Sequence, residues 1–247
     1  MKAMIFAAGN GTRLKPLTDK MPKALLPING KPMLEHLLLK LKAAGFAEIV
    51  INIHHFGEQI IQFLKSNSDF GLHIDISDER EYLMDTGGGI KQAARYFSES
   101  EPVLIHNVDI LSNVDLGELY QSHLTTDSLA TLLVNHRSST RQLLFDKSNC
   151  LRGWQNRETG EVKSLYPDFD PLTHTPFAFG GIHVISPKIV EYMDEWTGRF
   201  SIIDFYLSVC AKIPIRYYTT DDIDLMDIGK PETLAEADEW LDRHSVG

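Results

Sequence analysis

The sequence is poor in cysteine, and its two cysteines, Cys150 and Cys210, lie far apart. They do not form the close pairs of a zinc site, and two residues are too few for a disulfide framework. Nothing in this pattern requires an oxidising compartment. We therefore expect a protein that folds without such cross-links and resides in the cytoplasm.

Long apolar runs and an excess of basic residues are also absent. No stretch approaches the 18 apolar residues of a membrane-spanning helix, and the apolar run at residues 1–8 is too short for a signal peptide. Lys and Arg number 24 against 34 Asp and Glu, giving a formal net charge of -10. This balance argues against a nucleic-acid or membrane partner, although it permits a local site for one nucleotide. A monomer or small homo-oligomer is expected.

An alternation of strand-like and helix-like segments fills the first half of the 247 residues. The expected helix 32–44 places Leu34, Leu37, Leu38 and Leu41 on one face, and Gly45 ends it. The alternation predicts an α/β fold, a Rossmann-like, mostly parallel mixed sheet flanked by helices, in a single domain. The expected strands are 3–8, 48–53, 72–77 and 103–106, and the other expected helices are 58–65 and 89–96.

The second half contains more strands and fewer helices, so it should add mixed or antiparallel strands to the sheet. Strands are expected at 130–134, 142–145, 150–154, 177–185 and 213–218, and helices at 187–196, 202–210 and 231–243. No linker or internal repeat separates the halves. The domain is therefore expected to span 1–247, with a nucleotide-binding half at about 1–110 and a sugar-binding half at about 111–247.

A glycine-rich segment follows the first expected strand and runs from Ala8 through Gly9, Gly11, Thr12 and Arg13. Glycines allow the backbone to approach a ligand closely, and exposed amides in such a turn can hold phosphate oxygens. The segment is neither a Walker A loop nor a dinucleotide fingerprint, whose third glycine would fall at Leu14. Arg13, and Lys23 further on, place positive charge where a triphosphate would bind.

The whole string resembles the signature of the sugar-1-phosphate nucleotidyltransferases, Gly-x-Gly-Thr-Arg-Leu-x-Pro-Leu-Thr followed by Pro-Lys and a further Pro. The sequence matches it from Gly9 through Thr18 and again at Pro22, Lys23 and Pro27. The length, the short second half and the triple glycine are most similar to bacterial N-acetylmuramate 1-phosphate uridylyltransferases and mannose-1-phosphate guanylyltransferase-like proteins. The resemblance implies nucleotide binding at Ala8, Gly9, Gly11, Thr12 and Arg13, and catalytic roles for Arg13 and Lys23.

Two aspartates stand in contexts that suit a metal site. Asp109 follows the apolar strand 103–106, and ligands of open α/β sheets bind at the carboxyl ends of strands. Asp227 lies in an Asp-Ile-Gly-Lys-Pro string just before the last expected helix. The family has aspartates in both contexts, which implies that Asp109 and Asp227 hold Mg²⁺ and that Asp109 takes part in catalysis. Val108 replaces the family's usual glycine.

The base and sugar pockets are less well marked. Gly87 and Gly88 lie in a glycine-rich turn that, by resemblance, adjoins the nucleobase. The string 179–184 resembles the strand beside the family's sugar pocket, which implies a sugar contact at Gly181. No Glu-Lys-Pro triplet is found, and Lys163 in a Glu-Val-Lys string is a poor match to it. The sequence therefore leaves the base and the sugar open.

The resemblance implies transfer of a nucleoside monophosphate from a nucleoside triphosphate to a sugar 1-phosphate, releasing pyrophosphate. This reaction belongs to nucleotide sugar biosynthesis, here for cell envelope polysaccharide, and uridylyl or guanylyl transfer is expected. Two alternatives remain open. One is a phosphocholine-type cytidylyltransferase, which shares the N-terminal signature, and the other is a non-catalytic nucleotide-sensing subunit on the same fold.

Overall fold

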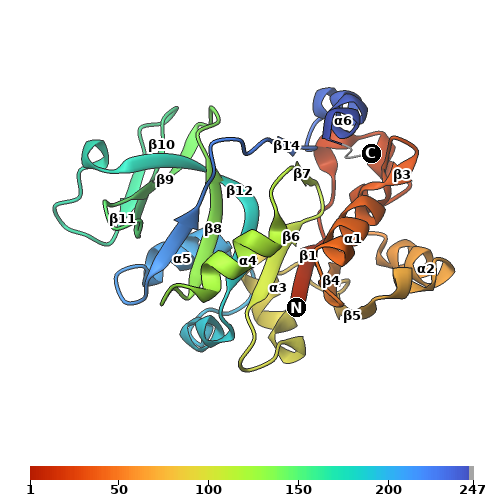
Figure 1. The fold of residues 1–247 in the computed structure, drawn as a ribbon, viewed down its shortest axis with the longest axis horizontal. Coiled ribbons are helices and arrows are strands. Elements are labelled where there is room, and N and C mark those ends of the chain that lie inside the picture. The colour runs from red at the N-terminus through yellow and green to blue at the C-terminus, as the bar shows by residue number, and fades with distance from the viewer. Residues whose placement is uncertain (245–247) are drawn as a thin grey trace. The chain divides into compact units, whose positions relative to one another are not determined.

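The computed structural model describes residues 1–244, which divide into two compact units that interleave along the sequence (Figure 1). The first unit contains residues 1–83, 105–117 and those from 224 onward, and the second contains 84–104 and 118–223. The division of the chain into a nucleotide-binding and a sugar-binding half stays a prediction.

Parallel strands form the centre of the first unit. Strand β1 (Lys2–Phe6) pairs with β4 (Glu48–Ile53), and β4 pairs with β5 (His73–Asp78), both in parallel. Helices α1 (Met33–Ala43) and α2 (Gly57–Ser66) connect them, as the alternation predicted. The four leucines expected on one face of α1 are all buried. Each parallel pair needs such a crossover, which explains why strand and helix alternate.

Later segments of the chain complete the first unit. Strand β6 (Val103–Asn107) ends in the first unit. Just after this strand, Val108 N donates at 3.1 Å to the carbonyl oxygen of Phe6, the last residue of β1. Strand β7 (Ile110–Ser112) pairs with β14 (Leu225–Asp227), and β2 (Pro27–Ile28) pairs with β3 (Lys31–Pro32), both antiparallel. Helix α6 (Pro231–His244) follows β14.

Antiparallel pairing dominates the second unit. The long strand β12 (Thr175–Ile185) pairs with β8 (Ala130–Asn135) along one part and with β9 (Arg141–Phe145) along the other. Strand β9 continues to β10 (Leu151–Asn156) and β11 (Val162–Ser164), while β13 (Ile215–Tyr218) runs parallel to β8. The predicted α/β class with a mixed sheet and helices is confirmed.

Three expectations about helices were wrong in detail. Helix α3 runs over Asp85–Ala93 and continues as a short 3₁₀ helix, so it begins four residues before the expected 89. The expected helix 187–196 is a 3₁₀ helix at Pro187–Met193, and α5 (Ile202–Val209) follows it. Helix α4 (Leu116–Leu124) was not expected. Triple glycine was interpreted as a turn, whereas close packing at Gly87 and Gly88 lets the helix begin there.

Candidate active site

The glycine loop begins where β1 stops pairing with β4. The amides of Ala7 and Ala8 both donate to Oδ1 of the Asn52 side chain, at 2.7 and 3.3 Å. The first expected strand therefore ends at Phe6, two residues early. Within residues 1–244, the amides of Gly9, Asn10 and Gly11 find no protein acceptor. Three consecutive amides of this kind suit the oxygens of a phosphate group.

Gly11 gives the loop its tight bend. Its φ of 61° lies in the left-handed region, and a Cβ there would come within 2.6 Å of the Thr18 methyl group. The buried Thr18 hydroxyl donates to Gly11 O at 2.8 Å, so this threonine of the signature ties the loop to its own continuation. Both the glycine and the threonine are therefore explained by local geometry.

Lys23 and Asp109, 86 residues apart, form a direct ion pair between Nζ and Oδ2. Their side chains are 9% and 23% exposed, respectively, so the pair is largely shielded from water. Lys23 lies in the short helical turn Lys23–Leu25, and Asp109 lies between β6 and β7. The structure thus brings together two of the three residues expected to be catalytic.

Asp227 is held beside Asp109 by backbone pairing. In the β14–β7 ladder Asp227 lies opposite Ile110, the residue after Asp109. The amide of Ile228 donates to Asp109 O at 2.9 Å. The two aspartates expected to bind metal, 118 positions apart in the sequence, thus lie on neighbouring backbone, Asp227 in β14 and Asp109 just before β7.

Arg13 reaches the same place from the glycine loop. A Cβ on Gly229 would lie 2.6 Å from Arg13 Nη2 and 2.8 Å from Asp227 Oδ1. The guanidinium therefore packs over the backbone of Gly229, close to the Asp227 carboxylate. This explains the glycine of the Asp-Ile-Gly string, since any side chain there would displace Arg13. Arg13 also joins the loop to the two aspartates.

The donor set in the first unit fits magnesium better than a transition metal. In the part of the chain described, residues 1–244, no group of three or more His, Cys, Asp or Glu side chains could enclose a metal ion. Mg²⁺ is commonly bound by one or two carboxylates together with substrate phosphates, and it prefers oxygen ligands. Asp109 and Asp227, on adjacent backbone beside phosphate-binding amides, supply that set.

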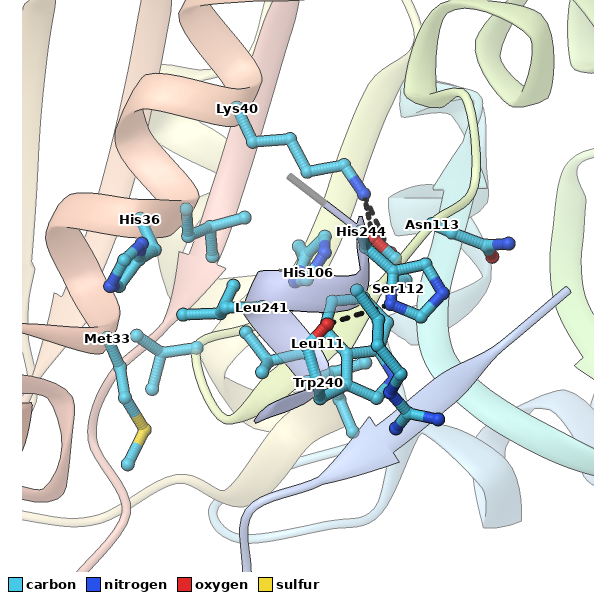
Figure 2. A pocket seen from close by; sticks show the side chains of 14 residues that line it. Met33, His36, Lys40, His106, Leu111, Ser112, Asn113, Trp240, Leu241 and His244 are labelled. Atoms are coloured by element: carbon cyan, nitrogen blue, oxygen red, sulfur yellow. Dashed lines mark hydrogen bonds between the residues drawn. The ribbon is translucent and has the colours of Figure 1, made fainter. Parts of the chain in front are cut away.

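A pocket of about 550 Å³ in the first unit is lined by α1, the β6–β7 segment and α6 (Figure 2). Lys40 donates there to the carbonyl and hydroxyl oxygens of Ser112, at the end of β7. Burial lowers the pKa of Lys40 to about 8, although Asp115 acts in the opposite direction. The lysine anchors α1 to the strand that follows Asp109.

His106 forms part of the floor of this pocket and is 1% exposed. Its Nδ1 bonds to Asn107 O at 2.8 Å, while Nε2 meets no partner within residues 1–244. Burial lowers the pKa of His106 to about 3; the bond to Asn107 opposes this shift and the charge of Lys40 adds to it. The imidazole is therefore neutral at physiological pH.

In the second unit, Gly87 and Gly88 lie in the first turn of α3. Their amides donate to Phe200 O at 2.9 and 3.3 Å. A Cβ on Gly87 would overlap the Phe200 ring, and one on Gly88 would come within 2.7 Å of Gly198 O. The glycines are thus required by close packing, and their amides already have acceptors. A role beside the nucleobase stays a prediction.

Lys163 lines a second pocket, of about 330 Å³, between the β10–β11 hairpin and the start of α5. Lys163 lies opposite Trp154 in the hairpin, with Nζ 5.1 Å from the ring centroid and 3.2 Å from Asp204 Oδ1. An aromatic ring flanked by charged and amide groups suits a polar ligand with apolar faces, such as a sugar.

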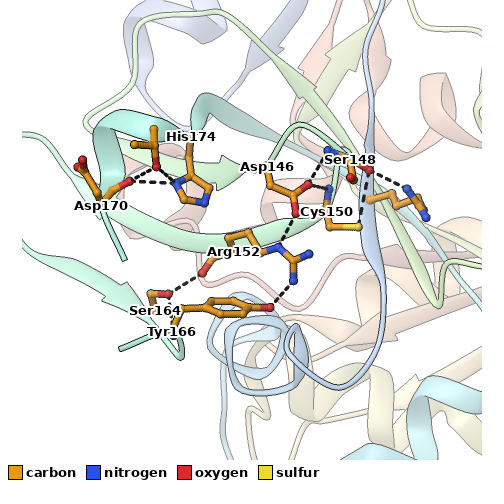
Figure 3. Close-up of polar contacts among 10 residues, drawn as sticks. Asp146, Ser148, Cys150, Arg152, Ser164, Tyr166, Asp170 and His174 are labelled. Atoms are coloured by element: carbon orange, nitrogen blue, oxygen red, sulfur yellow. Dashed lines mark hydrogen bonds and ion pairs between the residues drawn. The ribbon is translucent and has the colours of Figure 1, made fainter. Parts of the chain in front are cut away.

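Polar contacts among β9, β10 and the segment after β11 brace this hairpin (Figure 3). Arg152 pairs with Asp146 at 2.6 Å and donates to the Tyr166 hydroxyl, while Ser164 Oγ donates to Arg152 O at 2.8 Å. These contacts fix the strands that present Trp154 and Lys163. Gly181 lies elsewhere, in an irregular part of β12 with φ of 73°, and its sugar contact stays a prediction.

Several residues around these sites were missed by sequence reasoning. Asn52 and Glu79 support the glycine loop, Gly229 accommodates Arg13, and Trp154 with Asp204 completes the second pocket. The Asp-Ile-Gly string was recognised in the sequence, but the packing of its glycine against Arg13 could not be predicted. Asn52 follows the apolar run 49–51 in its strand, and a polar residue at that point was the available signal.

Known proteins are similar to this chain over nearly its whole length. Residues 2–243 match the family described as nucleotidyl transferase. N-acetylmuramate alpha-1-phosphate uridylyltransferase of Caulobacter vibrioides is 32% identical over 245 residues, 97% of this chain and 96% of the relative. Mannose-1-phosphate guanyltransferase of Yarrowia lipolytica is 34% identical over 204 residues, 78% of this chain and 52% of that protein.

Among solved structures, HddC from Yersinia pseudotuberculosis complexed with GMP-PN aligns with a TM-score of 0.75 and 25% identity. The alignment covers 97% of this chain and 99% of that chain. The likeness therefore includes the parallel strands of the first unit and the antiparallel strands of the second. A family match from residue 2 to residue 243 includes the glycine loop, Lys23, Asp109 and Asp227. The chain belongs to the nucleotidyl transferase family.

Proposed function

We propose that the protein is a uridylyltransferase that joins UMP from UTP to N-acetylmuramate 1-phosphate, releasing pyrophosphate. Its broader class is that of the enzymes that make nucleotide sugars from a nucleoside triphosphate and a sugar 1-phosphate. The choice of uridylyl transfer is supported by the Caulobacter vibrioides relative, which matches almost the full length of both chains. Guanylyl transfer is the competing choice.

The observation that carries the proposal is the meeting of Lys23 with Asp109 beside the Asp227 ladder. A mere tight turn would not require a shielded lysine, two neighbouring carboxylates and an arginine from three separate parts of the sequence. A non-catalytic nucleotide sensor would need the loop but not this convergence of charge. The arrangement is suited to neutralising two phosphate groups brought together.

In the proposed reaction an oxygen of the sugar 1-phosphate attacks the α-phosphorus of the nucleotide. The bond from that phosphorus to the bridging oxygen breaks, and pyrophosphate leaves with its electron pair. The amides of Gly9 to Gly11 bind phosphate oxygens, and Arg13 neutralises the departing pyrophosphate. Lys23 reduces repulsion between the two reacting phosphates. Most of the rate enhancement comes from positioning and charge neutralisation.

Asp109 and Asp227 are the proposed holders of Mg²⁺, which supplies Lewis-acid stabilisation of phosphate charge when bound. The ion pair with Lys23 orients the Asp109 carboxylate. In the second unit we propose that Lys163 and Gly181 contact the sugar, with Trp154 as an apolar platform, and that Gly87 and Gly88 adjoin the base. We also propose a cytoplasmic location and a monomeric or small homo-oligomeric state.

A pyrophosphate-release screen tests the proposal. UTP, GTP, CTP, ATP and dTTP are each combined with N-acetylmuramate 1-phosphate, glucose 1-phosphate, mannose 1-phosphate and phosphocholine, with Mg²⁺ or with EDTA. We expect Mg²⁺-dependent release with UTP and N-acetylmuramate 1-phosphate. Release only with GTP and mannose 1-phosphate would replace the uridylyl assignment, and release only with CTP and phosphocholine would replace the acceptor class. Nucleotide binding without release would favour the sensing subunit.

A further inference from the structure

We infer that Asn52 and Glu79 are positioning residues for the glycine loop, acting as a two-residue relay behind its phosphate-binding amides. The inference rests on the proposed function, because it gives these residues a role in binding the nucleoside triphosphate. Neither residue belongs to the glycine-loop signature. Asn52 lies near the end of β4, which pairs with β1, and Glu79 lies just after β5, which pairs with β4.

Asn52 supplies one acceptor to two consecutive backbone amides. Its Oδ1 accepts from Ala7 N at 2.7 Å and from Ala8 N at 3.3 Å, and the side chain is 1% exposed. These amides would otherwise seek partners in a continuing β ladder or in the ligand. Because Asn52 accepts hydrogen bonds from both amides, the strand ends at Phe6, and the amides of residues 9–11 remain available to a phosphate group. The asparagine thus determines where the phosphate cradle begins.

Glu79 fixes the orientation of the Asn52 amide. Asn52 Nδ2 donates to Glu79 Oε1 at 2.7 Å, which requires the oxygen of the amide group to face Ala7 and Ala8. Without this acceptor the amide group could turn by half a rotation and present its nitrogen to the two N–H groups. Nitrogen is a donor there, so the contact would be lost. The carboxylate therefore selects the one useful orientation.

The backbone N–H and C=O groups of Glu79 are both hydrogen-bonded. Its amide donates to Ile53 O at 2.8 Å, and its carbonyl bonds to His54 Nδ1 at 2.7 Å. The residue is 2% exposed. Burying a carboxylate is costly, and an apolar pair of similar volume would join two strand ends at lower cost. An apolar pair, however, could not accept hydrogen bonds from the two loop amides and so could not fix their direction.

The relay makes the loop rigid before the nucleotide binds. Binding sites that are preorganised lose less free energy to ordering when the ligand arrives. Amides aimed at a phosphate group also avoid reorganisation as charge shifts onto the leaving group. Loss of the relay should therefore weaken triphosphate binding and lower kcat. It should leave the KM for the sugar 1-phosphate little changed, whereas general loosening of the fold would change both.

A swap of the two functional groups tests the relay. Asn52→Asp places two buried carboxylates together and should raise the Kd for MgUTP, or for MgGTP if the wild type prefers it, about tenfold or more. Glu79→Gln keeps an acceptor for Asn52 and should stay within about threefold of the wild type. The double variant Asn52→Asp/Glu79→Gln restores one carboxylate and one amide, and should return to within about fivefold.

Asn67→Asp makes the same charge change at the exposed end of α2 and serves as the matched control, with an unchanged Kd expected. Calorimetric titration gives the Kd, and thermal unfolding reports stability separately. A double variant that binds as weakly as Asn52→Asp would overturn the inference. So would Asn52→Ala with wild-type affinity and a lower Tm, since that result means a purely structural role. A wild type that binds neither nucleotide would instead refute the proposed function.

Discussion

At the scale of single residues, the Lys23–Asp109 pair combines two demands. In the proposed mechanism the lysine neutralises phosphate charge, and the aspartate offers an oxygen to a cation. Because the pair is largely shielded, each side chain also depends on the other for a counter-charge. Replacing only one of them leaves the other charge partly buried and uncompensated. Isosteric changes are therefore more informative than truncations at these two positions.

Asp109→Asn is expected to lower turnover at least about 100-fold in the presence of Mg²⁺, because the amide replaces a charged metal ligand by a neutral one. The fold should persist, since the amide keeps the volume and one oxygen. Pyrophosphate release and thermal unfolding measure the two effects. Asp19→Asn, at an exposed ion pair, is the matched control and should behave as the wild type. Full Mg²⁺-dependent activity of Asp109→Asn would remove Asp109 from the metal site.

Gly229→Ala tests whether position 229 must lack a side chain in order to leave room for the Arg13 guanidinium. The new methyl group would meet the guanidinium at 2.6 Å and displace it, so the KM for the nucleotide should rise about tenfold. In an Arg13→Ala background the same substitution should have a smaller effect, because the contact with the guanidinium is gone and only that with Asp227 Oδ1 remains. Steady-state kinetics of the four proteins give the answer. Fully additive effects would contradict the explanation.

Sequence motifs were sufficient to propose the charged residues of the site, because each stands in a short string, or directly after an apolar strand, that resembles the family's pattern. Arg13, Lys23, Asp109 and Asp227 were all identified in this way. Asn52 and Glu79 could not be, since their importance comes from hydrogen bonds to residues 27 to 45 positions away. Gly87 was noticed, but its reason, the Phe200 ring, lies more than 100 residues further along the chain.

At the scale of elements, α1, β7 and α6 contribute to the lining of the larger pocket (Figure 2). Lys40 and His106 are the titratable groups that lie deepest in this region, and both have pKa values lowered mainly by burial. Their effects on stability occupy different pH ranges. For Lys40 the folded protein holds its proton less tightly than the unfolded chain, so stability rises with pH between about 8 and 10.5.

For His106 the pKa falls from 6.5 to about 3 on folding, so the unfolded chain binds more protons between these values. Stability should therefore be lost as the pH falls below 6.5, by about 2 kcal/mol at pH 5 from this residue. His123, with a pKa lowered to about 4 by burial, adds a loss in the same range. His106→Leu should flatten the pH dependence of the urea midpoint. An unchanged slope would show that His106 does not titrate in this way.

Elements were predicted well where apolar periodicity decided them, as in α1 and β4. They were predicted less well where tertiary packing decided them. The start of α3 is set by Phe200, and the end of β1 by Asn52. Short strands such as β7 and β14 have three residues each and no periodicity to detect, yet they bring together the two aspartates proposed to bind metal. The sequence thus singled out both aspartates but not the ladder between them.

At the scale of the whole molecule, each unit is assembled from separate stretches of the chain. The first unit takes its glycine loop from the beginning, Asp109 from the middle and Asp227 from the last part of the sequence. The alternation of strand-like and helix-like segments predicted the α/β class. The boundaries of the two units could not be predicted, because contacts between distant segments define them. The expected nucleotide-binding and sugar-binding halves, about 1–110 and 111–247, are each one continuous stretch of sequence, whereas each unit combines separate stretches.

A chain that ends at Ile223 should have no detectable turnover, because it lacks β14, Asp227 and α6. Loss of Trp240, which is 3% exposed, would also uncover apolar surface in the first unit. Pyrophosphate release and circular dichroism measure the two consequences, and full-length Asp227→Asn separates the missing carboxylate from the missing elements. Turnover of the shortened chain within about tenfold of the wild type would contradict the assigned role of Asp227.

The β14–β7 ladder has a consequence for protein synthesis. A ribosome makes Asp109 when less than half of this sequence has been translated, but its partner strand appears only about 115 residues later. At the usual rate of about 5 to 20 residues per second, the nascent chain spends several seconds with Asp109 exposed and β7 unpaired. Premature termination or proteolytic loss of the last segment would therefore release an inactive product rather than a weakened one. With the proposed roles of Asp109 and Asp227, catalytic competence would arise only after β14 has been made.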